Sequence, residues 1–200
     1  MNPLKTSQGF SLMELMVAMA VFSMIIAAII TARTDQQVQN ITQIQAAEMQ
    51  QSVRAVMFIM KQEIRMAGFN PYTTDYPGLG IATAGSTALT FSYVNTEVDP
   101  PVLKQVAYAL SDDDLDGDSD DITLNGTVLA ENIQNLTFRY FDGSSPVPLE
   151  LVAPVVNPAS IRSILISITA GIDRDELARG AATNRTRTLT STVFLRNMGL

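Results

Sequence analysis

The chain has 200 residues, of which 46% are hydrophobic and 16% charged, and it contains neither cysteine nor histidine. Without these residues the chain cannot form disulfides, thiolate nucleophiles, Cys/His zinc sites or a Ser-His-Asp triad, so we predict that it is not an enzyme. It has 13 basic and 20 acidic residues and a net charge of -7, which argues against nucleic-acid binding because a nucleic-acid-binding protein presents a basic surface to phosphates.

The first third of the chain predicts one long helix. Residues 10–67 contain neither glycine nor proline, whereas the remainder contains most of both. Gly68 and Pro71 follow, which is the expected stop signal for a helix. The turn-rich body after the helix, residues 68–200, holds eight basic and sixteen acidic residues and therefore carries a charge of -8.

The start of this helix predicts a membrane span. The stretch from Leu15 to Ala32 has no charged residue, and residues 10–32 exceed the ~20 residues that cross a hydrocarbon core. Lys5 precedes the stretch, so the positive-inside tendency places the leader in the cytoplasm and the acidic body outside. A cleaved signal peptide and a plain single-pass anchor are the alternatives. The helical pattern continues through Arg33, which argues against the first.

Glu14 argues against a plain anchor. A carboxylate near the centre of a bilayer costs ~2.5–3.5 kcal/mol on insertion scales, so its presence calls for a partner or a function. If the chain were cut between Gly9 and Phe10, the new α-amino group would lie four residues from Glu14, about one helical turn away. A neighbouring copy shifted by one turn could bring its own amine to this acid, and the pair would set the register between the helices.

These residues resemble a known signal. The string Gly9-Phe10-Ser11-Leu12-Met13-Glu14-Leu15, after a short basic leader and before an apolar helix, resembles the prepilin processing and assembly signal of type IV pilins and type II secretion pseudopilins. The resemblance implies that a prepilin peptidase cuts after Gly9 and that Phe10 becomes the N-methylated first residue. It also implies that Glu14 guides the subunit into a filament.

The same resemblance implies a division of the chain. Residues 1–9 would be the prepilin leader peptide, residues 10–33 the transmembrane and filament-core helix, and residues 34–200 a periplasmic or extracellular head that includes the second half of the helix. The implied location is the bacterial inner membrane and afterwards the tip of a pilus or pseudopilus. The implied partners are the peptidase, inner-membrane lipid, and other minor and major pilins or pseudopilins.

The head is predicted to be an α+β domain in which the helix packs on an antiparallel sheet. The second half of the helix carries an amphipathic stripe that we expect to form the core; its members are Val38, Ile41, Ile44, Met49, Val53, Met57, Met60, Ile64 and Ala67. Alternating patterns predict strands; these are expected at residues 88–94, 102–110, 135–141, 160–170 and 186–195. Residues 72–86, 142–159 and 171–185 are predicted to be loops.

Weaker similarities suggest a subfamily. Residues 51–71 and the ending 194–200 are similar to PilW-like minor pilins and, less closely, to the J-type pseudopilin. The missing cysteine pair and the helix without internal glycine or proline depart from the usual major pilin. We therefore expect a minor pilin that primes or caps a type IV pilus. The alternatives are a J-like minor pseudopilin at a type II secretion pseudopilus tip and a calcium-dependent adhesin head.

One acidic segment could bind a metal. Residues 111–121 contain alternating carboxylates, and the first half of the segment matches an EF-hand-type calcium loop with Gly117 at the sharp turn. The candidate calcium ligands are Asp112, Asp114, Asp116, Asp118 and Asp120. Thr123 occupies the position of the bidentate glutamate, so a complete EF-hand is not expected. A solvated acidic loop is the alternative, and no other cofactor is predicted.

Overall fold

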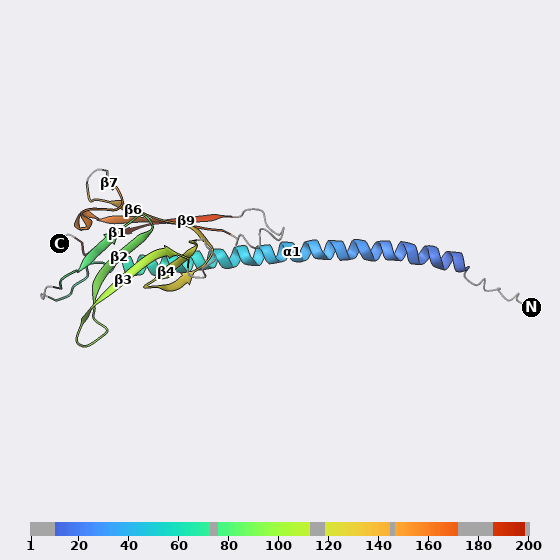
Figure 1. The fold of residues 1–200 in the computed structure, drawn as a ribbon, viewed down its shortest axis with the longest axis horizontal. Coiled ribbons are helices and arrows are strands. Elements are labelled where there is room, and N and C mark those ends of the chain that lie inside the picture. Colours follow the sequence, from blue (N-terminus) through green and yellow to red (C-terminus); the bar gives the residue numbers. More distant parts are fainter. Residues whose placement is uncertain (1–10, 73–75, 113–118, 145–146, 172–185, 199–200) are drawn as a thin grey trace, which may run out of the picture. The chain divides into compact units, whose positions relative to one another are not determined.

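The structure of the protein is a computed structural model that describes residues 11–72, 76–112, 119–144, 147–171 and 186–198. The chain divides into two compact units, residues 1–44 and 45–200. The first unit is helical from Leu12 onward, and the described residues of the second unit form nine strands and the end of the helix (Figure 1). The predicted α+β class with a long N-terminal helix on antiparallel strands is confirmed.

Helix α1 runs from Leu12 to Ile64. Its 53 residues are mainly Ala, Ile, Gln, Met and Val, without glycine or proline, so no residue breaks its backbone hydrogen bonds. After Ile64, the N–H of Ala67 donates to the Ile64 carbonyl at 3.1 Å, which tightens the last turn. Gly68 then adopts a left-handed φ of +75° and ends the helical run, as its sequence position predicts.

The first of two antiparallel sheets follows the helix. Its strand order is β1-β2-β3-β4-β5; the strands are β1 Gly80–Ala84, β2 Ala88–Asn95, β3 Val102–Ser111, β4 Asp121–Leu124 and β5 Thr127–Ala130. β2 and β3 occupy the predicted ranges. β1 lies in the predicted loop 72–86, and the short β4–β5 hairpin was not predicted. Asn125 and Gly126 connect that hairpin with φ values of 52° and 80°, which match a two-residue type I′ turn.

The second sheet has the order β7-β6-β8-β9 and is also antiparallel. Its strands are β6 Ile133–Phe141, β7 Glu150–Leu151, β8 Ser163–Ala170 and β9 Arg187–Phe194, and the 3-10 helix η1 Pro158–Ser160 precedes β8. The three long strands confirm the predictions, whereas β7 lies in the predicted loop 142–159. The predicted loop 171–185 lies outside the described residues, apart from Gly171.

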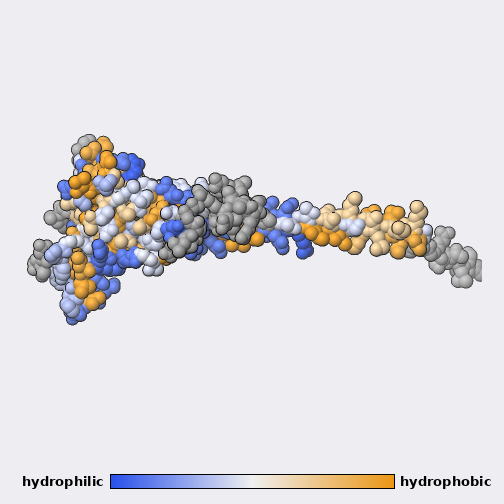
Figure 2. All heavy atoms as spheres, in the orientation of Figure 1, coloured by the Kyte–Doolittle hydropathy of each residue, from blue (hydrophilic) through white to orange (hydrophobic). Residues whose placement is uncertain are grey.

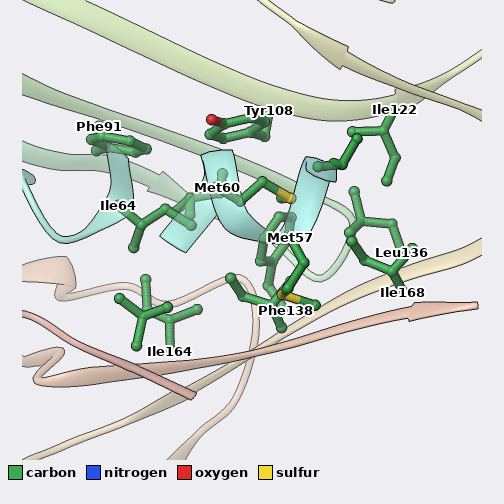
Figure 3. Close-up of a cluster of buried hydrophobic side chains, with 14 of the residues drawn as sticks. Met57, Met60, Ile64, Phe91, Tyr108, Ile122, Leu136, Phe138, Ile164 and Ile168 are labelled. Atoms are coloured by element: carbon green, nitrogen blue, oxygen red, sulfur yellow. The ribbon is translucent and has the colours of Figure 1, made fainter. Parts of the chain in front are cut away.

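The expectation of a single sheet is wrong, because the end of α1 is buried between two. In Figure 3 the helix carries Met57, Met60 and Ile64 between one group of strands and the other. The side chains that cover it from the first sheet include Phe91, Tyr108 and Ile122. Those from the second sheet include Leu136, Phe138, Ile164 and Ile168. A helix covered from two sides needs a wider apolar face than a single sheet requires, and Val53 and Val56 widen it.

The predicted core stripe is confirmed only in part. It is buried from Val53 to Ala67, and Met49 packs against it while partly exposed. Ile41 and Ile44 are 56% and 57% exposed, so their assignment to the core is wrong. The apolar periodicity continues into this region, but the compact unit that contains the covering strands begins only at Gln45. The side chain of Val38 lies outside the described part of the structure.

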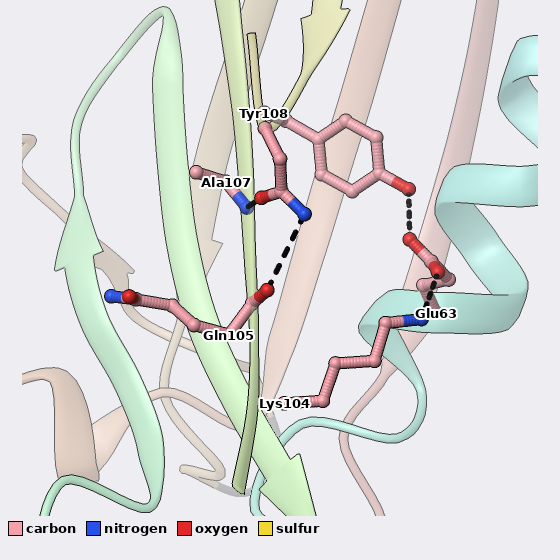
Figure 4. A network of polar contacts seen from close by, with 6 residues as sticks. Glu63, Lys104, Gln105, Ala107 and Tyr108 are labelled. Atoms are coloured by element: carbon pink, nitrogen blue, oxygen red, sulfur yellow. Dashed lines mark hydrogen bonds and ion pairs between the residues drawn. The ribbon is translucent and has the colours of Figure 1, made fainter. Parts of the chain in front are cut away.

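A polar contact fastens the end of α1 to β3. The Tyr108 hydroxyl donates to Oε2 of Glu63 at 2.7 Å, and Lys104 Nζ lies 3.4 Å from Oε1 of the same carboxylate (Figure 4). Glu63 is largely buried, so these two partners satisfy a carboxylate that would otherwise be costly to desolvate. Burial, together with the hydrogen bond to Glu63, raises the pKa of Tyr108 well above its ordinary value near 10.0. Burial alone raises the pKa of Tyr140.

The packing of α1 predicts opposite outcomes for two large side chains two residues apart. Met60 is fully buried between the sheets, so Met60→Ala should lower the free energy of unfolding by about 2–5 kcal/mol. Phe58 is 67% exposed, so Phe58→Ala should change it by less than about 0.5 kcal/mol. Urea denaturation of the detergent-solubilised chain, followed by near-ultraviolet circular dichroism, measures both values. Equal losses would contradict the position of α1 between the sheets.

The buried tyrosines predict a loss of stability in alkali. Their pKa values are raised in the folded state, so above about pH 10 the unfolded chain releases phenolic protons that the folded chain retains. Their contribution is complete below this pH and declines as the pH rises, and Tyr108→Phe should make the decline shallower. Phenolate absorbance during alkaline titration checks this. Simultaneous ionisation of every tyrosine near pH 10 in the folded chain would contradict it.

Candidate assembly site at the start of helix α1

Glu14 is the only charged residue in the first 21 residues of α1. It lies in the first turn, and its backbone N–H donates to the Ser11 carbonyl at 3.0 Å. Its side chain is exposed, and no described residue forms an ion pair with it. The positive end of the helix dipole favours a carboxylate at this place, but it does not provide a counter-ion.

The surroundings of Glu14 are apolar on every face of the helix. An 18-residue window of α1 has a mean hydropathy of 2.6, and none of that window is buried within the described protein. Figure 2 shows hydrophobic residues along this part of the helix. By length and composition α1 can therefore span a bilayer, where an apolar surface around the whole helix is stable.

The hydroxyl groups near this apolar segment have partners on their own helix. Ser23 donates to the Ala20 carbonyl at 2.8 Å, Thr31 donates to that of Ala27 at 2.8 Å, and Thr34 donates to that of Ile30 at 3.0 Å. Hydroxyls bonded in this way can enter hydrocarbon without an unsatisfied donor. Within the described apolar part of α1, Glu14 is therefore the polar side chain that still requires a partner. The sequence patterns do not reveal these bonds.

The other half of the candidate site falls outside the described residues. Gly9 and Phe10 both lie there, so the predicted cleavage position and the predicted amine are known from the sequence alone. Residue 10 precedes Glu14 by four positions, which is about one turn where the chain is helical. The role of Glu14 as the acid that meets an amine remains a prediction.

The acidic segment is described only at its two ends. Asp112 and Asp120 are described, whereas Asp114, Asp116 and Asp118 lie outside the described residues. Strand pairing of Ser111 with Asp121 holds the two ends together, and the Asp120 carbonyl accepts a hydrogen bond from the Ile133 N–H at 2.7 Å. Within the described ranges, no group of three or more carboxylates is arranged to hold a metal ion. Calcium binding remains a prediction.

A comparison with known protein families decides the nature of the N-terminal site. Residues 4–30 match the family described as the prokaryotic N-terminal methylation motif. At its N-terminus the chain resembles a type IV pilin-like or pseudopilin-like prepilin. The match includes Gly9, Phe10 and Glu14, and it confirms the resemblance to a prepilin and the expectation of processing by a prepilin peptidase. No curated protein and no solved structure matches the chain.

The methylation motif also bears on the predicted class of protein. It belongs to subunits that are processed and assembled, so this pilin-like chain is structural and not enzymatic, as its composition predicts. The motif also implies pilin-like assembly partners, and it agrees with an N-terminal helix that can span a membrane by length and composition. The match ends at residue 30, and therefore the PilW-like and J-type assignments remain untested.

Calcium binding can be measured directly. We expect calorimetry on the body, roughly residues 35–200, to show binding that the Asp114→Ala/Asp116→Ala double change abolishes, because the change removes two of the alternating oxygen ligands. The body with Glu97→Ala, which removes an exposed acid outside the acidic segment, is the control and should bind as the unmodified body does. A flat titration of the unmodified body would contradict the calcium hypothesis.

Proposed function

We propose that this pilin-like chain is a minor pilin, a structural subunit that primes or caps a type IV pilus after prepilin-peptidase processing. The observation that carries the proposal is the methylation motif over residues 4–30, at the start of a helix whose apolar part contains the single charge of Glu14. In this proposal residues 1–9 are the leader, residues 10–33 form the membrane-spanning and filament-core helix, and residues 34–200 form the head.

The role of Glu14 follows from its surroundings. Apolar helices gain little hydrophobic free energy when they leave lipid for one another, so packing and polar pairs must supply specificity. Two unit charges 4 Å apart attract by ~4 kcal/mol at an effective dielectric near 20, before desolvation removes much of this. An amine at Phe10 of a neighbouring subunit would therefore fix the axial register more than it would add stability. A neighbour in the wrong register would leave Glu14 unpaired.

Two features support a minor rather than a major subunit. The chain has no cysteine with which to staple its C-terminal region. Helix α1 is continuous from Leu12 to Ile64, whereas the helices of major pilins commonly contain glycine and proline that let them loosen on assembly. A helix that does not loosen on assembly is better suited to a minor subunit, which is present in only a few copies per filament.

The location follows from the charge of the leader and the membrane helix. Lys5 lies before the apolar segment and the head is acidic, so the leader would remain in the cytoplasm and the head would lie outside the inner membrane. Processing would then allow the subunit to move from the membrane to a filament tip. A J-like pseudopilin of a type II secretion system would use the same processing and assembly steps, and the neighbouring genes would distinguish the two machines.

Two substitutions separate processing from assembly. Gly9→Val should leave an unprocessed precursor, because the peptidase requires close approach to the backbone before the scissile bond. Glu14→Val should still be cleaved but should enter filaments poorly, because the amine of the neighbouring subunit loses its partner. Mass spectrometry of the N-terminus and immunoblotting of sheared filaments measure the two steps in the producing cell. Equal incorporation of the Glu14 variant would contradict the proposed role.

A further inference from the structure

Strand β9, Arg187–Phe194, lies at one edge of the second sheet (Figure 1). It pairs with β8 over all eight of its residues without a register shift. In the part of the chain that the structure describes, no other strand pairs with its second side. An edge strand of this kind presents a row of backbone N–H and C=O groups with which another chain can pair.

The hydrogen bonds at the two ends of β8 show which backbone groups of β9 point away from the sheet. At one end the Gly171 N–H donates to the Asn132 carbonyl, on the side of β6. At the other end the Leu195 N–H donates to the Arg162 carbonyl, on the side of β8. Because N–H groups alternate between the two sides of a strand, both bonds direct the even-numbered residues of β9 outwards. These are Thr188, Thr190, Thr192 and Phe194.

The outward groups of β9 are free, and the other sheet edges are short or covered. Within the described ranges, the backbone groups of the four outward residues form no hydrogen bond beyond the pairing with β8. By contrast, β5 and β7 have four and two residues. β1 has five residues and a register shift, and its Ala84 carbonyl accepts a hydrogen bond from the Val155 N–H at 3.0 Å.

β9 also lacks the features that commonly protect an edge. Proteins block edge strands with proline, lysine, a bulge or a very short strand. β9 has eight residues, no proline, no lysine and no bulge, and its one charged residue, Arg187, stands at its first position. A long edge left open in this way indicates a site for strand pairing.

The side chains of β9 suit a partner strand. The hydroxyls of Thr188 and Thr190 lie 2.9 and 3.4 Å from hydroxyls of β8. Thr192 continues the same row, and Phe194, which is 69% exposed, ends it. Threonine and aromatic side chains are favoured in strands and make cross-strand pairs, so an added strand would find partners along the whole row.

The charge around β9 is positive. Residues 151–200 contain six arginines and three acidic residues, whereas residues 68–150 contain two basic and thirteen acidic residues. Arg187 at the start of β9 and Arg196 just after its end are both exposed. Neither forms an ion pair within the described ranges. They are nine residues apart, which is roughly 30 Å along an extended chain. A partner strand with acidic residues near both of its ends would match them.

A second copy of this chain is a poorer match. Within the described ranges, the one comparably long free edge that a second copy offers is its own β9. Antiparallel pairing of two β9 strands would bring Arg187 of each copy close to Arg196 of the other, and like charges oppose this contact. The acidic segment 111–121 consists largely of aspartate and contains glycine, and both are depleted in strands.

We propose that the free edge of β9 binds an extended acidic segment of another protein, which adds to the second sheet as a further strand. The main-chain hydrogen bonds of the four outward residues hold this segment, and Arg187 and Arg196 select acidic side chains near its two ends. The site lies wholly within the head. The inference is therefore independent of whether the chain primes or caps a pilus.

Hydrogen exchange of the full chain in detergent tests whether the edge is open. We expect the N–H groups of Thr188, Thr190 and Thr192 to exchange about tenfold or more faster than those of Leu189 and Ser191, which face β8. Mass spectrometry with residue-level fragmentation measures both sets. Equal protection of the two sets would show that the edge is already covered, and it would overturn the proposal.

A synthetic peptide tests the class of partner. The probe is a fluorescein-labelled peptide of about twelve residues, with alternating threonine and valine between glutamates at both ends. Fluorescence anisotropy with the full chain should show saturable binding, and the same peptide with lysine in place of glutamate should bind about tenfold or more weakly. Failure of the glutamate peptide to bind, or equal binding of the two peptides, would overturn the proposal.

Two substitutions at one position test whether the backbone makes the contact. Thr190→Pro removes an outward N–H but no hydrogen bond to β8, so it should weaken binding of the glutamate peptide about tenfold or more. Thr190→Val is the matched control, because it loses the same hydroxyl and keeps the N–H, and it should change the affinity less than about threefold. Equal losses in the two variants would contradict strand pairing.

A charge reversal gives a test that does not depend on how the head tolerates proline. Arg187→Glu combined with Arg196→Glu changes two exposed side chains and should make the lysine peptide the tighter binder. An unchanged preference would overturn the acidic partner. A dimer in sedimentation that Thr190→Pro dissociates would assign the edge to a second copy and overturn the proposal as well. In each case, a processed and incorporated chain would leave the minor-pilin proposal standing.

Discussion

The structure depends on a single uninterrupted helix whose surroundings change along its length. Over its first 21 residues α1 is apolar on every face apart from Glu14, and none of its apolar window is buried in the described protein. From Val53 onward its buried side chains are apolar and meet the two sheets, and its exposed side chains are mostly polar, with Phe58 an exception. The backbone hydrogen bonds are the same in both halves, so the side chains alone decide whether a turn belongs in lipid or in a folded core.

The head is organised around the end of that helix. Two antiparallel sheets contribute aromatic and aliphatic side chains to opposite sides of Met57, Met60 and Ile64. The contact of Glu63 with Tyr108 and Lys104 adds direction to this packing, because a largely buried carboxylate with two specific partners tolerates little rotation or sliding of the helix. Apolar burial supplies most of the stability, and the polar contact defines one register.

Periodicity predicted the long elements and missed the short ones. The helix, its glycine stop and the five longer strands follow from spacing and from glycine and proline, whereas β1, β4, β5 and β7 have five residues or fewer. Asn125-Gly126 is a strong hairpin signal that would have revealed β4 and β5. Periodicity also cannot show where a covering layer begins, and for this reason Ile41 and Ile44 were misassigned. The motif around Glu14 could be recognised from local sequence, but the pairing of Glu63 with Tyr108 required the fold.

The hydrogen bonds from the hydroxyls of Ser23, Thr31 and Thr34 to carbonyls of α1 affect the transfer of the helix from lipid into a filament. Each hydroxyl donates to a carbonyl of its own helix. These groups therefore need no new acceptor when the helix moves from lipid to a protein environment. The one described side chain whose electrostatic environment must be rebuilt during such a transfer is Glu14. The apolar segment can therefore leave the membrane as an intact helix. Glu14, in the first turn, is then the group that distinguishes a correctly placed neighbouring subunit from an incorrectly placed one.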